Sequence, residues 1–162
     1  MSDASGFQAL TDRLPKYMDE LGDCDVLGMN TDAERRTLRG KVMQRAPSGR
    51  GIYVLYEDSI PMYVGRSDDL ASRLLAHGRR SGTSENSSFA FNLAKEEFPQ
   101  SDALTRRQLQ REDQFKRLFS AAKERVRKMD VRVVEATDPI EQTVLEVYAH
   151  LELNTFNSFE NH

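Results

Sequence analysis

Apolar positions in the first part of the chain recur at the spacing of amphipathic helices. Residues 5–21 place apolar side chains three or four positions apart, which predicts a helix, and Pro15 predicts a break or a kink within it. Thr31 and Glu34 have the spacing of a capping box, so we expect a second helix over residues 31–45. Pro47 and Gly49 then indicate a linker. Residues 1–45 are too few for a core of their own, which predicts a helical extension packed on a domain of residues 46–162.

The spacing changes to that of strands at residues 51–57 and 61–65, which are rich in β-branched and aromatic types and predict a hairpin. The length of its loop decides where two tyrosines point. A three-residue loop over residues 57–59 would place Tyr53 directly opposite Tyr63, with both rings on one face. A two-residue loop would pair Tyr53 with Val64 and put the two tyrosines on opposite faces. A function that needs both rings therefore requires the odd-numbered loop.

Helical spacing returns after the hairpin. We expect a helix over residues 67–80, capped by Ser67 or Asp68, then a loop over residues 81–87 and a short helix over residues 89–98. A long helix over residues 105–129, a strand over residues 131–136 and a last helix with Pro139 at its first position complete the pattern. This order predicts an α+β fold: a small antiparallel three-stranded sheet flanked by helices, with an N-terminal helical extension and a helical insertion.

Composition changes this picture little, but the distribution of charge matters. The formal net charge of −3 disfavours a general nucleic-acid binder. However, residues 19–34 are acidic whereas residues 73–128 are rich in Arg and Lys, and the local field decides binding. The basic stretch up to Lys128 is either a nucleic-acid surface or a solvated helix face. Cys24 is the only cysteine, so we expect a cytoplasmic protein, and no apolar run is long enough for a membrane helix.

Candidate chemistry lies at fixed steps from the hairpin. Arg73 and His77 are four residues apart on one face of a predicted helix, which alone is an ordinary surface pattern. Tyr63 is followed by Arg66, Arg73 and His77 at three, ten and fourteen residues. Together with Gly51-Ile52-Tyr53 and Tyr63-Val64-Gly65, this spacing resembles the core motif of the GIY-YIG nuclease family, with Val64 in place of the family's Ile.

The resemblance covers residues 51–80 and 131–157 and is loose between them. Glu141 resembles the family's Glu on a later helix, and Asn157 resembles the Asn that follows this helix. Asn154 has a similar offset from Glu141 and is an alternative.

The resemblance implies a metal-dependent endonuclease that hydrolyses DNA phosphodiester bonds, with Mg²⁺ or Mn²⁺ held by Glu141. The catalytic residues it implies are Tyr53, Tyr63, Arg73, His77 and Glu141. Phosphodiester hydrolysis needs positive charge at the phosphate, which a cation and the fork of an arginine supply. A hard cation can bind through one carboxylate and keep several waters. Tyr53 can accept a proton at neutral pH only if a neighbour lowers its pKa, and His77 can relay one.

The expected partner is double-stranded or branched DNA, and we expect no association with a membrane. The residues expected to contact it are Arg66, Asn157, Arg79, Arg80, Arg107 and Arg111. One active site cuts one strand, so a double-strand break requires a homodimer or two binding events.

Each assignment has a structural alternative. Glu141 is also explained as the end of a capping box begun by Asp138, and the two tyrosines as half-buried sheet residues. Gly51 and Gly65 mark close backbone approach under either interpretation. Two other classes of function stay open: a non-catalytic nucleic-acid-binding module that kept the fold, and a protein-interaction module whose acidic extension binds a partner or covers the basic face.

Overall fold

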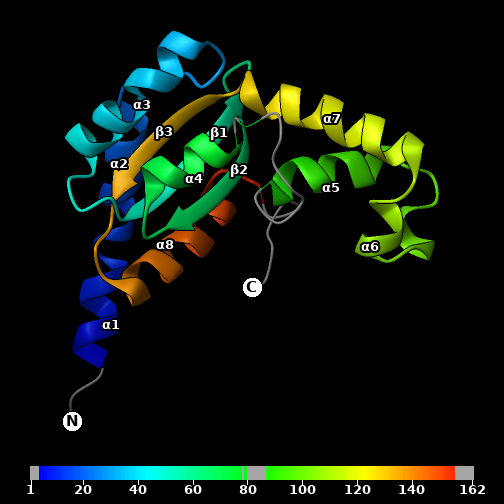
Figure 1. Cartoon of the computed structure of the whole chain (residues 1–162). Coiled ribbons are helices and arrows are strands. Elements are labelled where there is room, and N and C mark those ends of the chain that lie inside the picture. Colours follow the sequence, from blue (N-terminus) through cyan, green and yellow to red (C-terminus); the bar gives the residue numbers. More distant parts are fainter. Residues whose placement is uncertain (1–3, 78, 80–86, 156–162) are drawn as a thin grey trace.

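The computed structural model of the chain describes residues 4–77, 79 and 87–155 (Figure 1). Three strands, β1 (Gly51–Glu57), β2 (Ile60–Ser67) and β3 (Asp130–Glu135), form an antiparallel sheet in the order β2-β1-β3. The α+β class and the small three-stranded sheet predicted from the sequence are therefore confirmed.

Helices surround this sheet. They are α1 (Ala4–Thr11), α2 (Leu14–Asp23), α3 (Asp32–Arg45), α4 (Leu70–His77), α5 (Ser88–Glu97), α6 (Arg106–Leu109), α7 (Asp113–Arg127) and α8 (Pro139–Glu152), with a 3₁₀ turn at Ser101–Ala103. In Figure 1, α5 and α7 lie side by side and project away from the sheet, with α6 at their far end. This arm contains helices that the sequence predicts between the second and third strands. Among the described residues, no helix combines the length and the apolar character needed to cross a membrane.

The sheet separates two hydrophobic cores. On one face, Tyr53, Leu55 and Tyr63 pack with apolar residues of α3, α4, α5 and α7. On the other face, Ile52, Val54 and neighbouring strand residues pack with α2 and α8. This division follows from the alternation of side chains along a strand, and it assigns every site residue on these elements to one face or the other.

The first 45 residues contribute to both cores. Helix α2 lies on the α8 face, and α3 lies on the face of the tyrosines. Between them the chain passes the edge of β3, where Leu27 and Val131 exchange two backbone hydrogen bonds of 2.8 Å. Leu38 and Val42 of α3 are fully buried. The extension therefore closes one edge of the sheet, which limits its use as a template for another strand.

The hairpin loop differs from the sequence-based expectation. Two residues, Asp58 and Ser59, join the strands, and their φ angles of 50° and 67° are those of a type I′ turn. Such turns match the twist of paired strands, which favours the short loop. Tyr53 lies opposite Gly65 rather than opposite Tyr63, so the expected three-residue loop and the direct pairing are wrong.

A β-bulge nevertheless returns both rings to one face. Leu55 pairs with Tyr63, the next residue of β1 pairs with Pro61, and Met62 is the extra residue between them. One additional residue reverses the alternation of side chains. The two-residue loop and the one-residue bulge together place Tyr53 and Tyr63 on the same face, as a three-residue loop would.

Helix boundaries also differ from expectation. The first predicted helix is broken before Leu14, and Pro15 lies in the first turn of α2, where its missing N–H costs nothing. The long helix expected over residues 105–129 is wrong, because α6 ends at Leu109 and α7 begins at Asp113. Leu109 and Phe115 are both buried but lie six positions apart, which is out of phase on a continuous helix.

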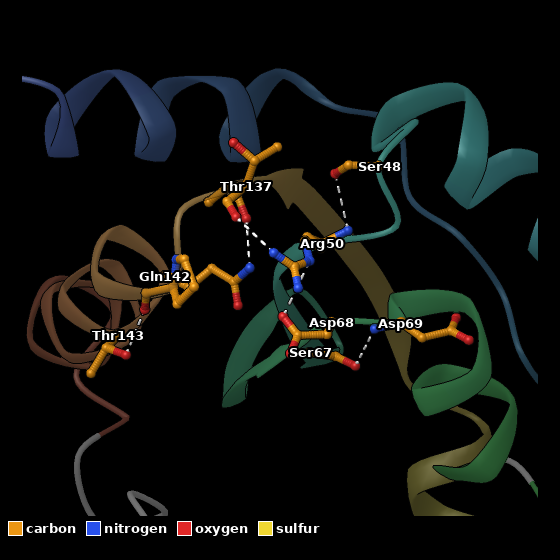
Figure 2. Close-up of polar contacts among 10 residues, drawn as sticks. Ser48, Arg50, Ser67, Asp68, Asp69, Thr137, Gln142 and Thr143 are labelled. Carbon is orange, nitrogen blue, oxygen red and sulfur yellow. Dashed lines mark hydrogen bonds and ion pairs between the residues drawn. The ribbon is translucent and has the colours of Figure 1, made fainter.

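The cap of α4 is Asp69 rather than Ser67 or Asp68. Its carboxylate accepts a hydrogen bond from the backbone N–H of Ser72 at 3.0 Å, as in an N-cap. The Ser67 hydroxyl instead accepts from the N–H of Asp69 at 3.0 Å (Figure 2).

Arg50 joins the loops that position α4 and α8 (Figure 2). Its guanidinium donates to the Thr137 carbonyl at 3.3 Å and forms an ion pair with Asp68 at 3.5 Å. The amide of Gln142, in the first turns of α8, donates to the Ala136 carbonyl at 2.7 Å. The start of β1, the β2–α4 turn and the β3–α8 loop are therefore tied together at one end of the sheet.

Candidate functional site

Four of the predicted catalytic residues form one cluster between the sheet and α4. Tyr53 and Tyr63 come from adjacent strands, and Arg73 and His77 from α4. The ring centroids of the two tyrosines are 6.0 Å apart, and His77 lies 5.5 Å from Tyr53 and 6.1 Å from Tyr63. Tyr53, Tyr63 and His77 are buried, whereas Arg73 is partly exposed. The cluster therefore meets solvent through Arg73.

Hydrogen bonds connect its members. The Tyr53 hydroxyl lies 2.7 Å from His77 Nε2 and accepts from Arg73 Nε at 3.3 Å. Arg73 Nη2 donates to the Ser88 hydroxyl at 3.4 Å, and Arg73 also hydrogen bonds to Tyr63. The other ring nitrogen of His77, Nδ1, is buried and has no hydrogen-bond partner among the residues that the structure describes. The guanidinium of Arg73 is thus held on two sides by neutral hydroxyl groups.

Burial sets the protonation of the cluster. Desolvation, with a smaller contribution from Tyr63, raises the pKa of Tyr53 well above its ordinary value, although Arg73 opposes the shift. Desolvation and the charge of Arg73 lower the pKa of His77 from 6.5 to about 3. Burial alone would lower the pKa of Arg73, but its interactions with Tyr53 and Tyr63 raise it. At neutral pH the cluster is a neutral phenol and a neutral imidazole beside a fixed cation.

Gly65 makes room for the Tyr53 ring. A Cβ atom at Gly65 would lie 2.5 Å from Cζ and from the hydroxyl oxygen of Tyr53, closer than any normal contact. Gly51, with φ of 155°, would bring a Cβ atom within 2.0 Å of the Val134 carbonyl oxygen. Both glycines therefore mark close backbone approach, as expected from the sequence, and Gly65 does so at the cluster itself.

His150 of α8 reaches the same cluster from the edge of β2. Its ring contacts Tyr63 edge-on, with centroids 6.4 Å apart, and Tyr63 stacks on Phe89 at 4.7 Å. The His150 Nδ1 lies 2.8 Å from the Thr155 hydroxyl. Desolvation lowers the pKa of His150, against hydrogen bonds to Thr155 and Val64 that raise it. No sequence motif identified His150, because only the path of α8 along β2 brings it to Tyr63.

Glu141 lies outside this cluster. It belongs to the first turn of α8, on the opposite face of the sheet, and its side chain is 9% exposed. Its carboxylate forms an ion pair with Arg13 Nε at 3.0 Å and a hydrogen bond with Tyr17. Burial and Glu141 raise the pKa of Tyr17 to about 12. The backbone N–H of Glu141 donates to the Asp138 carboxylate at 2.9 Å, so half of the alternative capping box is present.

Glu146, which the sequence did not single out, contacts a predicted site residue. Arg66 Nε donates to its carboxylate at 3.0 Å, and the two side chains are 40% and 13% exposed. Glu146 also lies one helical turn before His150. The spacing of four residues places Glu146 and His150 on one face of α8, but only the packing of α8 along β2 brings that face to the site.

The remaining residues predicted to contact DNA are at the surface or lie outside the described residues. Arg79 follows α4 and is exposed, as are Arg107 on α6 and Arg111 just beyond it. Arg80 and Asn157 lie outside the described residues. Asn154 follows the C-cap residue of α8 and has a φ of 55°, a conformation that Asn often takes directly after a helix. The presence of Asn at position 154 is therefore explained by its place after the helix.

Within the described part of the chain, no three or more His, Cys, Asp or Glu side chains gather as a metal site would require. No family model, no curated protein and no solved structure matches the chain.

Proposed function

We propose that the chain is a metal-dependent endonuclease that hydrolyses DNA phosphodiester bonds, as its resemblance to the GIY-YIG nuclease family implies. The observation that supports this most is the cluster of Tyr53, Tyr63, Arg73 and His77. These residues match the motif of that family in type and spacing, and they converge from two strands and a helix. Ordinary surface residues at the same spacing would have no reason to share hydrogen bonds.

Arg73 is the member suited to bind phosphate. Two of its nitrogens hold Tyr53 and Ser88, which fixes the plane of the guanidinium while part of it faces solvent. A fixed cation in a poorly solvated place stabilises negative charge that develops on phosphate oxygens. Tyr53 and His77 are positioning residues in this arrangement. Because burial keeps Tyr53 protonated at neutral pH, it holds Arg73 rather than removing a proton from water.

The position of Glu141 does not suit a metal ligand for this cluster. Its carboxylate lies in the first turn of α8, nine residues before His150, and is engaged by Arg13 and by Tyr17 of α2. Glu146 suits the role better, because it lies beside Arg66 and within one turn of the residue that contacts Tyr63. Mg²⁺ or Mn²⁺ bound by Glu146 would supply positive charge to the phosphate. We therefore assign the metal carboxylate to Glu146 and a structural role to Glu141.

DNA is the proposed partner, held through its backbone by exposed arginines. Arg79 follows the helix that carries Arg73, and Arg107 and Arg111 lie at the far end of the α5–α7 arm. Contacts of this kind neutralise phosphates without reading sequence. Weakly specific or structure-selective nicking is the expected outcome, and a double-strand break would need a homodimer or two binding events.

Cleavage by two matched carboxylate variants tests the assignment. Supercoiled plasmid and branched DNA are incubated with Mg²⁺ or Mn²⁺ and wild type, Glu146→Gln or Glu141→Gln. We expect Glu146→Gln to lose at least about a hundredfold in turnover, as removal of a charge-stabilising group commonly does, and to unfold like the wild type. Glu141→Gln should lose stability but keep turnover once folded. The reverse pattern would restore Glu141 as the ligand.

A non-catalytic nucleic-acid-binding module is the second candidate. The burial of Tyr53 and His77 favours it, because a substrate cannot touch either group in this arrangement. Salt-sensitive DNA binding without turnover in Mg²⁺, Mn²⁺ or other divalent metals would support this candidate.

A further inference from the structure

Three arginines from separate parts of the chain meet at the end of α4. Arg35 lies on α3, Arg127 in the last turn of α7, and Arg79 just beyond α4. Helix α4 packs against both α3 and α7. Arg35 Nη2 donates to the Leu75 carbonyl at 3.1 Å, which places its guanidinium two residues before His77 along α4. Arg35 is thereby placed beside α4, on the face of the sheet that carries the tyrosine cluster, and it is close enough to Arg79 and Arg127 for their charges to act on it.

Two of these guanidinium groups keep buried donors without partners. Arg35 Nη1 and Arg127 Nε are inaccessible to solvent and have no hydrogen-bond partner among the described residues. The Arg127 residue as a whole is only 9% exposed. Within the described part of the chain, the carboxylates that pair with Arg127 do so at the outer limit of an ion pair: Asp32 at 3.8 Å, with a side chain 87% exposed, and Glu124 at 4.0 Å. Leaving a buried charged donor unpaired is costly, so an arrangement with two of them calls for a missing partner.

Like charges crowd the same place. Desolvation lowers the pKa of Arg35, and the charges of Arg127 and Arg79 lower it further, with Asp32 opposing them. An anion that enters beside the exposed Arg79 would remove this repulsion, and a shift of the Arg35 and Arg127 side chains toward it would bring their unpaired donors within reach. Phosphate oxygens suit guanidinium forks, which bind them through two parallel hydrogen bonds.

We propose that Arg35, Arg79 and Arg127 form a binding site for a phosphate oxyanion at the end of α4, filled by a phosphodiester of DNA next to the tyrosine cluster. The choice of DNA rests on the proposed nuclease function, whereas the anion site does not. The extension supplies Arg35, so α3 adds to a basic site instead of covering one. Of its acidic residues, Asp19, Glu20 and Asp23 lie on α2, and Asp32 and Glu34 lie at the start of α3.

Binding in the absence of divalent metal tests the proposal without requiring turnover. Fluorescence anisotropy of a labelled DNA duplex is followed in EDTA at about 50 to 200 mM salt, where phosphate contacts dominate affinity. The variants are Arg35→Gln and Arg127→Gln, with Arg36→Gln, an exposed neighbour on α3, as the matched control. Each site variant should bind several-fold more weakly, and the slope of log affinity against log salt should fall by about 0.9 per lost phosphate contact.

A second arm separates DNA from free phosphate. Inorganic phosphate should raise the melting temperature of the wild type and of Arg36→Gln, relative to chloride of equal ionic strength, and should raise that of Arg35→Gln and Arg127→Gln much less. Arg35→Lys, which keeps a charge, controls for loss of fold. Phosphate stabilisation with unchanged DNA affinity would keep the anion site and overturn its assignment to DNA. If both site variants match Arg36→Gln in both arms, the site does not exist.

Discussion

Replacing His77 by Gln tests whether His77 is buried in its neutral form within the tyrosine cluster. Burial and Arg73 lower the pKa of His77 from 6.5 to about 3. Below the pKa of the unfolded chain, the unfolded state therefore binds a proton that the folded state excludes. Since stability rises with pH wherever the unfolded state binds more protons, this contribution is complete above pH 6.5 and is lost as the pH falls toward 3.

The size of the effect follows from the same shift. At about pH 5 the unfolded imidazole is roughly 97% protonated while the folded one is almost wholly neutral, and linkage gives a loss of about 2 kcal/mol relative to about pH 7.5. This value is nearly the same for any folded pKa below about 4, because the folded group is neutral at pH 5 in every such case. In His77→Gln the contribution is absent.

Urea unfolding, followed by circular dichroism at both pH values, gives the free energies. The loss between about pH 7.5 and pH 5 should be larger in the wild type than in His77→Gln by about 2 kcal/mol. His150 and the carboxylates titrate in both proteins, so their contributions cancel in the difference. Equal pH dependence of the two proteins would show that His77 is not buried in its neutral form and would refute the cluster geometry.

Three further substitutions test the fold around the site. Gly65→Ala should cost roughly 1–3 kcal/mol in urea unfolding, because its methyl group would overlap the Tyr53 ring; unchanged stability would contradict the close approach. Deletion of Met62 should abolish cooperative folding observed by NMR, since it removes the bulge that sets side-chain alternation, and a native spectrum would be the opposing result. Arg13→Ala and Glu141→Ala should be coupled by about 1 kcal/mol in a double-mutant cycle of unfolding, and additive losses would exclude their ion pair.

The local spacing of residues was enough to predict much of the fold and of the tyrosine cluster. Arg73 and His77 could be placed together because helical geometry fixes residues four apart on one face. The three strands could be predicted because their composition is typical of half-buried strands. A function that uses both rings requires Tyr53 and Tyr63 on one face, but loop length alone does not decide whether they lie there. A bulge at Met62 leaves no signal in a run of apolar residues, and so the register itself was wrong.

Contacts between distant parts of the chain could not be predicted from the sequence. Nothing near Glu141 indicates that Arg13 and Tyr17 would meet its carboxylate, because that contact depends on α2 packing against α8. The break between α6 and α7 had a readable cause, since Leu109 and Phe115 are out of helical phase. The helical phase of the apolar positions over residues 105–129 therefore indicates a break between Leu109 and Phe115.

Nicking of supercoiled plasmid by wild type and Arg73→Ala, in Mg²⁺ or Mn²⁺ and in EDTA, tests the central claim most directly. Arg73 is the partly exposed cation of the cluster, and both proteins are first shown to fold and to bind DNA. The account predicts metal-dependent nicking by the wild type and a loss of at least about a hundredfold in Arg73→Ala. Equal nicking by the two proteins, or no nicking by a DNA-bound wild type with either metal, would contradict it.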